Sequence, residues 1–590
     1  MNDKSVRSLY LFSALIGISG AFYISLSPLP YILKGMAVIF FFIGLFQFLK
    51  WHFLVSLSKG LTQLNIFQLS PSKFPGEAGE IYLGKGFNWD NRHVQEMYNL
   101  SKKDTKRFLA RNEELGGKSV IHGVGAREER NIFIPEKEFV GHVALVGATR
   151  VGKTRALEML MAQAIRRKEP VVVIDPKGEK RLQDFCYSQT IASGREKEDF
   201  VWFSLPYPRY SATYNPLSTY SAITDIPDRI TALLPQAGTS KDFTDFCHGV
   251  VLAVAQGLNF LDRVITLSDI GRYALSLEYL GQLMTETIGK HLGENIENFG
   301  EVSMDNPEKS IKFYRNAVRG GMEINESCEG LIDYYQHPRE HFEKMAGGLR
   351  KLLSSLNAGE NKKLLSAVPA DIDWENLFEK RSKVAYFSLA SLLGKETASA
   401  IAQITLQDLV SYVGRRYTYT STRSPVWIFI DEFQNVCYPG FIDLISKAGG
   451  AGLRVVIAIQ SIADLEANMG YNAKAAAQQI LDNTNIKIFM RATDMDTPKK
   501  FTDKVGKTTI KEYSEMTSIT PEVDDSQEVF DTSFRKSKRD KEVFLVRPEW
   551  INELPKGHAF VYSQGGTYKV RFPLLPEPER NFLKDKGIEE

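Results

Sequence analysis

Residues 143–154 of the chain read VALVGATRVGKT. The first four are apolar and β-prone, as expected for a strand buried on both faces of a parallel sheet. The next eight match the phosphate-binding pattern G-x-x-x-x-G-K-T, and residues 155–166 behind them have helical composition. A strand that turns through a glycine-rich loop into a helix lets backbone N–H groups and the helix N-terminus surround phosphate oxygens. The pattern therefore predicts a nucleotide site on an α/β sheet.

Every residue of this loop is a predicted ligand of the nucleotide. We expect Lys153 to contact the β- and γ-phosphates, and we expect the hydroxyl of Thr154 to bind Mg²⁺. The predicted cofactors are therefore ATP and Mg²⁺. The predicted nucleotide-binding residues are Gly147, Ala148, Thr149, Arg150, Val151, Gly152, Lys153, Thr154 and Arg155.

Two further predicted strands supply the rest of a hydrolytic site. Residues 425–432 read PVWIFIDE, an apolar strand that ends in two acids. We expect Asp431 to hold the Mg²⁺ shell and Glu432 to activate the attacking water as a general base. Residues 454–460 read RVVIAIQ, and Gln460 is the predicted γ-phosphate sensor. The alternative for Gln460 is a strand-end amide that caps a helix or faces solvent. The predicted catalytic residues are Lys153, Glu432 and Gln460.

Four more apolar runs complete a predicted sheet. They cover residues 171–175, 200–205, 384–389 and 486–490. Because near-continuous apolar strands alternate with helical stretches, the sequence predicts a parallel-dominated sheet covered on both faces. Residues 558–563 and 567–572 predict a terminal β-hairpin.

The rest of the chain divides by composition. Between residues 226 and 350 the spacing is helical with few β-branched runs, which predicts an all-helical insertion. Residues 507–541 are polar with few apolar anchors, so we expect a mobile loop or extension there. The predicted domains are residues 1–60 (transmembrane hairpin and flanks), 61–225 (first part of the nucleotide-binding domain), 226–350 (helical insertion), 351–506 (second part of the nucleotide-binding domain), 507–541 (flexible polar segment) and 542–590 (terminal hairpin and tail). The predicted fold class is an α/β, RecA-like P-loop NTPase.

Two apolar runs near the N-terminus, residues 9–26 and 31–49, each approach the ~20 residues that cross a bilayer as a helix. Basic residues flank the pair on both sides, namely Lys4, Arg7, Lys50 and Lys59. Because such residues favour the cytoplasmic side, the sequence predicts two transmembrane helices with both ends in the cytoplasm. The alternatives are a cleaved signal peptide, although no clear A-x-A site follows the first run, or a buried helical hairpin of a soluble core.

The composition sets limits on function. A formal net charge of +2 over 590 residues creates no global field that would attract nucleic acid. Any DNA contact must then come from local basic surface. The cysteines are Cys186, Cys247, Cys328 and Cys437. They lie far apart in the sequence, which indicates neither a disulfide framework nor a zinc site and favours a reducing compartment.

Several short motifs resemble those of conjugative coupling proteins. They are Gly141-His142 before the first strand, Asp175 to Glu179 (DPKGE) after the second, Tyr214 to Leu217 (YNPL), and Lys447 to Gly452 (KAGGAG). Tyr82 to Phe87 (YLGKGF) and residues 488–494 add to the likeness. The chain resembles the TraD family of type IV coupling proteins, in the branch found on SXT-type integrative elements. The resemblance extends from the N-terminal hairpin almost to the C-terminus.

The resemblance implies an ATPase of the bacterial inner membrane that acts in conjugation, with its ATPase domain in the cytoplasm. The implied partners are a relaxase, single-stranded DNA linked to it, components of a type IV secretion channel, the membrane, and further copies of the chain in a homo-hexamer. ATP sites in such rings lie between subunits, so a neighbour supplies an arginine. FtsK-like translocases often carry that arginine shortly before the third strand, where this chain has Gly449. Arg454 and Arg491 are the candidates to replace it.

Two other functions stay open. The first alternative is an FtsK-like DNA translocase of the same motor class. The second is a membrane receptor that binds a relaxase or other cargo and uses ATP as a switch. A purely structural scaffold is disfavoured because it needs no complete hydrolytic set. The dependence of the ATPase rate on single-stranded DNA separates a motor from a receptor.

Overall fold

The computed structural model describes residues 11–13, 15–16, 18–19, 38–39, 41–51, 66–76, 79–102, 114–234, 241–293, 306–380, 382–419, 424–470, 472–524 and 527–588. The two predicted transmembrane runs lie only partly within these ranges. Among the residues described, no helix combines the length and the apolar character that spanning a bilayer requires. The N-terminal hairpin therefore stays a prediction.

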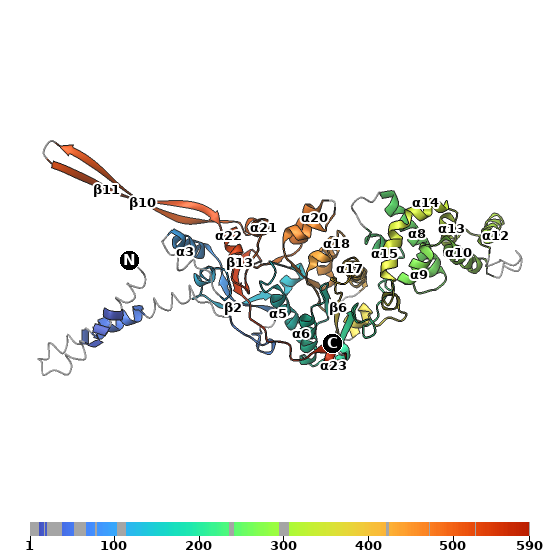
Figure 1. The fold of residues 1–590 in the computed structure, drawn as a ribbon, viewed down its shortest axis with the longest axis horizontal. Helices are drawn as coiled ribbons and strands as arrows, with labels where there is room; N and C mark the ends of the chain where they lie inside the picture. The colour runs from blue at the N-terminus through green and yellow to red at the C-terminus, as the bar shows by residue number, and fades with distance from the viewer. Residues whose placement is uncertain are drawn as a thin grey trace.

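A sheet of eleven strands forms the centre of the molecule (Figure 1), in the order β2-β1-β13-β12-β9-β3-β8-β7-β4-β6-β5. Every pairing from β9 to β5 is parallel, and β12, β13, β1 and β2 extend the sheet by antiparallel pairing. The predicted parallel-dominated α/β sheet is confirmed. The bounds are β1 (Glu80–Asn88), β2 (Arg130–Pro135), β3 (Val143–Val146), β4 (Val171–Asp175), β5 (Phe200–Ser204), β6 (Val384–Ser388), β7 (Val426–Ile430), β8 (Leu453–Ile459), β9 (Ile486–Phe489), β12 (His558–Ser563) and β13 (Gly566–Arg571).

Helices cover both faces of this sheet. In β3, Val143 and Leu145 pack into the core beneath α5, whereas Ala144 and Val146 pack into the core on the opposite face. An apolar residue is needed at every strand position because neither face meets solvent. The helices of the sheet domain are α3 (Asn91–Lys102), α4 (Val120–Gly123), α5 (Lys153–Arg166), α6 (Lys180–Ala192), α17 (Lys395–Tyr419), α18 (Phe441–Ala448), α19 (Ile462–Ala467), α20 (Ala473–Asp482), α21 (Asp496–Val505), α22 (Pro548–Asn552) and α23 (Phe582–Asp585).

The segment between β5 and β6 is helical and lies at one end of the molecule (Figure 1). Its helices are α7 (Asp225–Thr231), α8 (Lys241–Phe260), α9 (Leu267–Ala274), α10 (Leu277–Leu292), α12 (Pro307–Arg319), α13 (Glu326–Tyr335), α14 (Arg339–Met345), α15 (Gly347–Leu356) and α16 (Asn361–Leu365). The predicted boundary at residue 350 falls inside α15 and is wrong. Helix α15 contacts α9 of the insertion as well as α17 of the sheet domain, so it belongs to the junction between them.

Residues 507–541, predicted to be a mobile loop or extension, have regular backbone structure instead. They form β10 (Lys507–Asp524) and most of β11 (Gln527–Phe544), a two-stranded ladder that projects away from the sheet domain (Figure 1). The ladder pairs in register from Lys507 opposite Phe544 to Asp524 opposite Gln527. The polar composition misled the prediction because backbone pairing across a hairpin satisfies N–H and C=O groups without an apolar core along its length.

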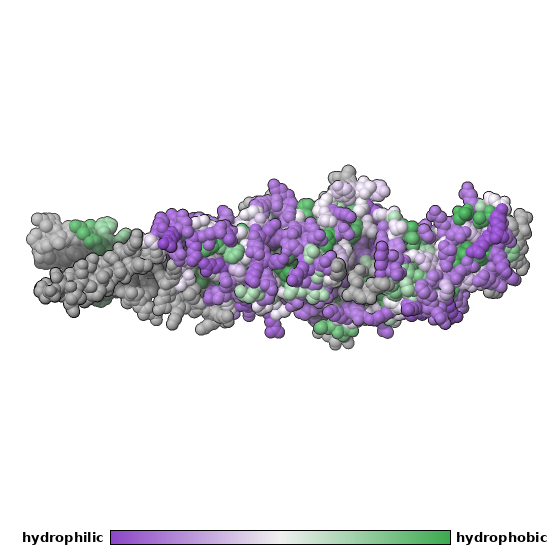
Figure 2. Space-filling view, turned by 90° about the horizontal axis from the view of Figure 1, so that it is seen from above, coloured by the Kyte–Doolittle hydropathy of each residue, from purple (hydrophilic) through white to green (hydrophobic). Residues whose placement is uncertain are grey.

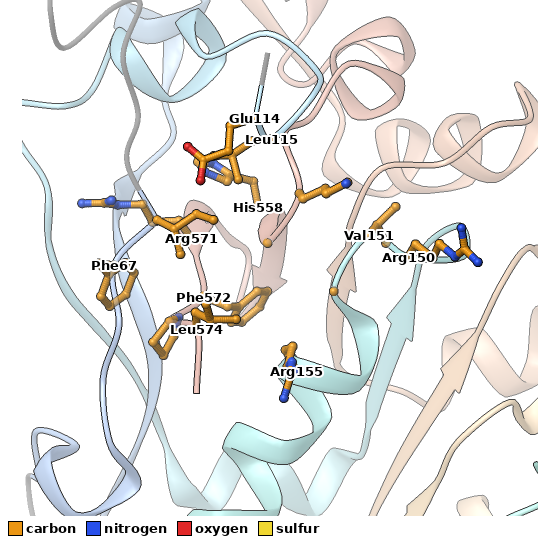
Figure 3. Close-up of a pocket in the computed structure, with 15 residues that line it drawn as sticks. Phe67, Glu114, Leu115, Arg150, Val151, Arg155, His558, Arg571, Phe572 and Leu574 are labelled. Carbon is orange, nitrogen blue, oxygen red and sulfur yellow. The ribbon is translucent and has the colours of Figure 1, made fainter. Parts of the chain in front are cut away.

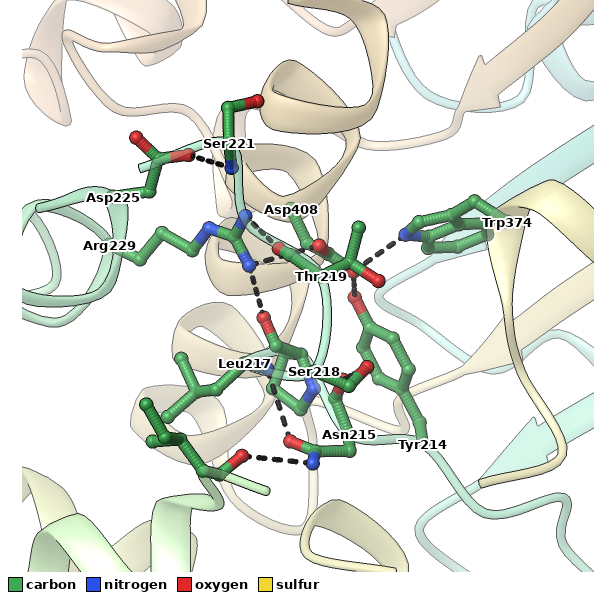
Figure 4. Close-up of polar contacts among 12 residues, drawn as sticks. Tyr214, Asn215, Leu217, Ser218, Thr219, Ser221, Asp225, Arg229, Trp374 and Asp408 are labelled. Carbon is green, nitrogen blue, oxygen red and sulfur yellow. Dashed lines mark hydrogen bonds and ion pairs between the residues drawn. The ribbon is translucent and has the colours of Figure 1, made fainter. Parts of the chain in front are cut away.

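The YNPL motif joins the helical insertion to the sheet domain (Figure 4). Asp408 of α17 is buried at this junction. The hydroxyl of Tyr214 donates to Asp408 Oδ2 at 2.6 Å, and Trp374 Nε1 donates to the same oxygen at 2.6 Å. From the insertion side, the guanidinium of Arg229 on α7 donates to Asp408 Oδ1 at 3.0 Å. One carboxylate therefore holds partners from both parts of the chain.

The same guanidinium also fixes the loop that contains the motif. Arg229 donates to the carbonyl oxygen of Pro216 at 2.5 Å and to that of Thr219. Asn215 Nδ2 donates to the carbonyl oxygen of Ile265 at 3.0 Å, which adds a contact with the segment before α9. The particular sequence of this motif is thus explained by a buried polar junction.

We expect Asp408→Asn to destabilise the protein strongly. The substitution leaves the buried Arg229 guanidinium without its counter-charge, and breaking a buried pair in this way costs about 3–5 kcal/mol. Glu343→Gln is the matched control, because the Arg339–Glu343 pair (3.0 Å) is exposed and such pairs contribute less than about 1 kcal/mol. Thermal unfolding of the three proteins measures the difference. An Asp408→Asn protein that unfolds with the wild type would show that the junction does not depend on this ion pair.

His142, which precedes β3, ties the amino-terminal edge of the sheet to α18. Its Nδ1 accepts a hydrogen bond from the N–H of Val455 at 3.2 Å, so its Nε2 carries the proton and donates to the carbonyl oxygen of Ile445 at 2.8 Å. Burial lowers the pKa of His142 from 6.5 to about 4. The Gly-His motif is therefore a structural link held by a neutral imidazole.

Acid should weaken the fold through this imidazole. Between pH of about 6.5 and 4 the unfolded chain binds a proton at His142 that the folded chain does not, so the free energy of unfolding falls as the pH falls through this window. Lowering the pKa of one group by this amount changes the free energy of unfolding by roughly 3 kcal/mol across the window. Because His122 and His558 are also buried with lowered pKa values, the test compares slopes. The unfolding temperature of His142→Gln, plotted between pH 7 and 4, should fall less steeply than that of the wild type. Equal slopes would contradict the assignment.

Candidate active site

The register of three parallel strands brings the predicted site residues to one edge of the sheet. Val146 of β3 pairs with Ile459 of β8, and Ile430 of β7 pairs with Ile457 of β8. The residues that follow these strands must therefore emerge side by side. The phosphate loop follows β3, Asp431 and Glu432 follow β7, and Gln460 follows β8.

The loop is braced on three sides by backbone hydrogen bonds. The N–H of Gly147 donates to the carbonyl of Ile459 (3.2 Å), and the N–H of Ala148 donates to that of Arg491 (2.8 Å). On the far side, the N–H of Gly557 donates to the carbonyl of Val151 (2.8 Å). Gly152 has φ of 107°, a conformation that favours glycine. These hydrogen bonds and the Gly152 conformation define the shape of the loop.

Lys153 lies over this loop and is only 6% exposed. Its ammonium donates to the carbonyl oxygens of Gly147 (2.6 Å) and Ala148 (3.0 Å). Burial lowers the pKa of Lys153, and the negative charges of Glu432 and Asp431 oppose that effect. The charge of Lys153 is therefore held beside the acids and above the loop, where phosphates would enter.

Asp431 is a buried acid at this edge. Burial raises its pKa to about 7, and the nearby charges of Asp175 and Glu432 add to the rise, whereas the N–H of Glu432 and the charge of Lys153 oppose it. The predicted Mg²⁺ residues, Asp431 and Thr154, offer only oxygen donors, which suits Mg²⁺. Within the described ranges no group of three His, Cys, Asp or Glu side chains is placed to share a metal. Mg²⁺ commonly takes one or two carboxylates and keeps waters, so the residues present fit it.

Asp175 lies close to these acids but is committed to other partners. Its Oδ1 accepts from the N–H groups of Lys177 (3.0 Å) and Gly178 (2.9 Å). Its Oδ2 accepts from the N–H of Glu179 and the hydroxyl of Tyr386, both at 2.6 Å. The DPKGE motif is therefore a turn that a buried carboxylate closes at the start of α6.

One carboxylate oxygen of Glu432 accepts hydrogen bonds from two side-chain amides. Gln460 Nε2 and Gln434 Nε2 each lie 2.5 Å from Glu432 Oε2. Gln460 thus lies in the site beside the predicted general base. Gln434 was not predicted as a site residue, because a glutamine in the turn after an acidic strand matches no pattern that we used.

A cavity of about 280 Å³ adjoins the loop (Figure 3). Arg150, Val151, Gly152 and Arg155 form one side of it, and Phe67 and Phe572 lie on the other. The Arg155 guanidinium also binds Glu158 at 3.1 Å and Glu577 at 3.3 Å. No local pattern indicated the aromatic walls, since Phe67 and Phe572 come from segments more than 500 residues apart in the chain.

The arginine candidates have different surroundings. Arg454 is 8% exposed, binds Glu136 at 2.6 Å and stacks over Trp427. It lies at the amino end of β8, on the edge opposite this chain's own site, and its role toward a neighbouring subunit stays a prediction. Arg491 follows β9 at the site edge, where its carbonyl oxygen holds Ala148. At Gly449 a Cβ atom would lie 2.5 Å from the carbonyl oxygen of Val140, which explains why no arginine occupies that position.

The fold and the loop define the class as a P-loop NTPase of the RecA-like type. Two family models then match the chain. Residues 130–293 match the type IV secretion-system coupling protein DNA-binding domain, and residues 425–556 match the model described as the TraM recognition site of TraD and TraG. The chain belongs to the type IV coupling proteins. Its placement in the SXT-type branch stays a prediction.

Individual relatives agree with this family. VirD4 of Agrobacterium fabrum strain C58 is 25% identical over 236 residues, which cover 38% of this chain and 33% of VirD4. DotL, the type 4 coupling protein of Legionella pneumophila, is 23% identical over 480 residues, which cover 74% of this chain and 58% of DotL. The plasmid coupling protein TrwB, solved with the ATP analogue ADPNP, shares the fold with a TM-score of 0.50 at 14% identity, over 86% of this chain and 98% of TrwB. The chain spans about a third of the length of VirD4.

Proposed function

We propose that this protein is an ATPase of the bacterial inner membrane that couples a relaxase-linked DNA strand to a type IV secretion channel during conjugation. The observation that carries the proposal is the meeting of Lys153, Asp431, Glu432 and Gln460 at one sheet edge, in a chain of the coupling-protein family. The matched DNA-binding model supports DNA as substrate, and the matched TraM recognition model supports a protein partner near residues 425–556.

In this proposal ATP and Mg²⁺ bind at the phosphate loop. The backbone N–H groups of residues 147–154 surround the phosphates, and Lys153 neutralises the β- and γ-phosphates. Thr154 and Asp431 hold Mg²⁺, which supplies positive charge to the phosphate oxygens. Glu432 accepts a proton from water as the water oxygen bonds to the γ-phosphorus and the bond to the bridging oxygen breaks, which yields ADP and phosphate. Gln460 senses the γ-phosphate from the neighbouring strand.

The membrane and ring parts of the proposal rest on separate observations. In the helical residues 41–51 the apolar side chains of Phe42 and Phe46 are 62% and 64% exposed. Figure 2 shows apolar residues of this region at one end of a largely hydrophilic surface. Such a helix suits a bilayer better than water, which supports the two-helix membrane hairpin. For a homo-hexamer with shared ATP sites, Arg454 and Arg491 are the candidates for the arginine that a neighbour supplies.

The decisive experiment is steady-state ATP hydrolysis by the full-length chain with and without single-stranded DNA, at several salt concentrations. We expect DNA to stimulate hydrolysis and salt to weaken the stimulation, because phosphate contacts release counterions. Lys153→Ala should abolish hydrolysis, and Glu432→Gln should keep ATP binding but lose turnover. Normal hydrolysis by Lys153→Ala would show that the site is assigned wrongly. Hydrolysis indifferent to DNA would favour the membrane receptor that uses ATP as a switch, and stimulation by duplex DNA alone would favour an FtsK-like translocase.

The cavity beside the loop is the proposed site of the adenine base. One wall includes Arg150, Val151 and Gly152 of the phosphate loop together with Arg155, and the opposite wall carries Phe67 and Phe572. An aromatic ring that stacks on a base contributes about 1–3 kcal/mol. The segment that contains Phe67 is paired with the C-terminal part of the chain, since the N–H of Leu574 donates to the carbonyl of Phe67 at 2.9 Å.

Phe67→Ala should therefore weaken ATP binding by roughly 10-fold or more. Inorganic tripolyphosphate carries no base, so its affinity should not change. Phe74→Ala is the matched control, because Phe74 lies in the same segment but packs on Tyr82 and does not line the cavity. Equilibrium titration with both ligands distinguishes the outcomes. Equal weakening of ATP and tripolyphosphate would contradict a base site at Phe67.

A further inference from the structure

Gln434 occupies a short 3₁₀ turn, η6 (Phe433–Asn435), directly after the predicted general base. Glu432 adopts φ of 45° and ψ of 45°, a left-handed conformation that is unfavourable for a residue with a side chain. This conformation reverses the chain and returns the Gln434 side chain to the Glu432 carboxylate, at 2.5 Å from Nε2 to Oε2. Backbone strain of this kind is concentrated at functional sites.

The contact fixes the orientation of the Gln434 amide. An ionised carboxylate only accepts hydrogen bonds, so the NH₂ group of Gln434 must face Glu432 and its carbonyl oxygen must face elsewhere. Gln434 is 6% exposed, and its Oε1 is buried without a hydrogen-bond partner among the described residues. Leaving a buried acceptor unsatisfied destabilises a protein. A free acceptor therefore lies beside the general base.

Two backbone donors of the turn and the Lys153 ammonium are already in use. The N–H of Asn435 donates to the carbonyl of Glu432 (2.9 Å), and the N–H of Val436 donates to that of Phe433 (3.0 Å). The ammonium of Lys153 donates to the phosphate loop. Phosphate oxygens accept hydrogen bonds and cannot satisfy another acceptor. A hydrogen-bond partner for Gln434 Oε1 must therefore have an O–H or N–H group and lie close to Glu432.

We propose that this partner is the attacking water and that Gln434 orients it. Water has two O–H groups; one would donate to Glu432, which takes that proton, and the other to Gln434 Oε1. Two acceptors fix the plane of the water and direct a lone pair of its oxygen away from both of them, toward the γ-phosphorus. The Nε2 group of Gln434 holds Glu432 in place at the same time. This assignment rests on the proposed role of Glu432 as the general base.

The two glutamines then have different tasks. Gln460 lies at the end of β8, next to the strand that carries the phosphate loop, so its second N–H suits a phosphate oxygen. Gln434 belongs to the same turn as Glu432 and moves with it. That turn is braced from outside, since the Phe433 and Phe441 rings lie 4.4 Å apart and the Cys437 thiol donates to the carbonyl of Gln434 at 3.5 Å.

The test uses Gln434→Met in the full-length chain. Methionine keeps the length of the side chain and removes both polar atoms, so a badly oriented water should lower kcat by roughly 100-fold with KM for ATP unchanged. Binding supplies a second measurement. The affinity for ADPNP, which resembles the ground state, should stay within about twofold of wild type. The affinity for ADP with aluminium fluoride, which resembles the transition state, should fall by about the same factor as kcat.

Gln403→Met is the matched control. Gln403 on α17 donates to the carbonyl of Cys437 at 3.3 Å, near the same turn, but makes no hydrogen bond to Glu432. It should keep the wild-type kcat and both affinities. A Gln434→Met protein with kcat within twofold of wild type would overturn the proposal, and so would equal loss of both affinities, which would indicate a structural role. If Glu432→Gln keeps full turnover, the proposed base is itself wrong and the role of Gln434 fails with it. Loss of turnover in Glu432→Gln alone would overturn only the role of Gln434.

Discussion

The parallel register of β3, β7 and β8 is the constraint on which the rest of the structure depends. Because Val146 pairs with Ile459 and Ile430 pairs with Ile457, the loop, the two acids and Gln460 all emerge at one edge of the sheet. The same register explains why these strands are apolar at every position, because both faces are covered. A slip of one residue would turn each side chain to the other face and separate Glu432 from Gln460. Burial of the strands on both faces therefore keeps the predicted site residues together at the carboxyl edge.

The opposite edge of the sheet has a complementary role, since it holds the strands in that register. His142 accepts from Val455 and donates to Ile445, and Arg454 binds Glu136 beneath the ring of Trp427. These polar contacts are buried and have specific geometry, so they define the alignment of β8 where dispersion contacts alone would not.

The sequence predicted the features that form local patterns and missed those that depend on contacts formed in the folded chain. The apolar runs, the phosphate loop and the acidic strand end are local patterns, and they gave the sheet and the position of Lys153, Asp431 and Glu432. Phe67, Phe572 and Asp408 act through partners hundreds of residues away, so no local pattern identifies them. Gln434 was missed although it is adjacent to Glu432, because its role depends on the left-handed turn at Glu432, which nothing in the sequence signals. The ladder of β10 and β11 was missed because backbone pairing does not require the apolar anchors that we sought.

The three acids near the loop show how hydrogen bonding assigns roles to similar groups. Asp175 has four donors on its two oxygens, all of them groups of the protein, and is left with little capacity for a metal. One oxygen of Glu432 accepts hydrogen bonds from two amides, so the other oxygen is the one that would accept a proton. Asp431 accepts from the N–H of Glu432, and burial with two neighbouring acids raises its pKa to about 7. A carboxylate in that state gains most from a divalent cation, since the cation removes the repulsion that raises the pKa. These contacts and charges support the proposed role of Asp431, and not Asp175, as the acid that holds Mg²⁺.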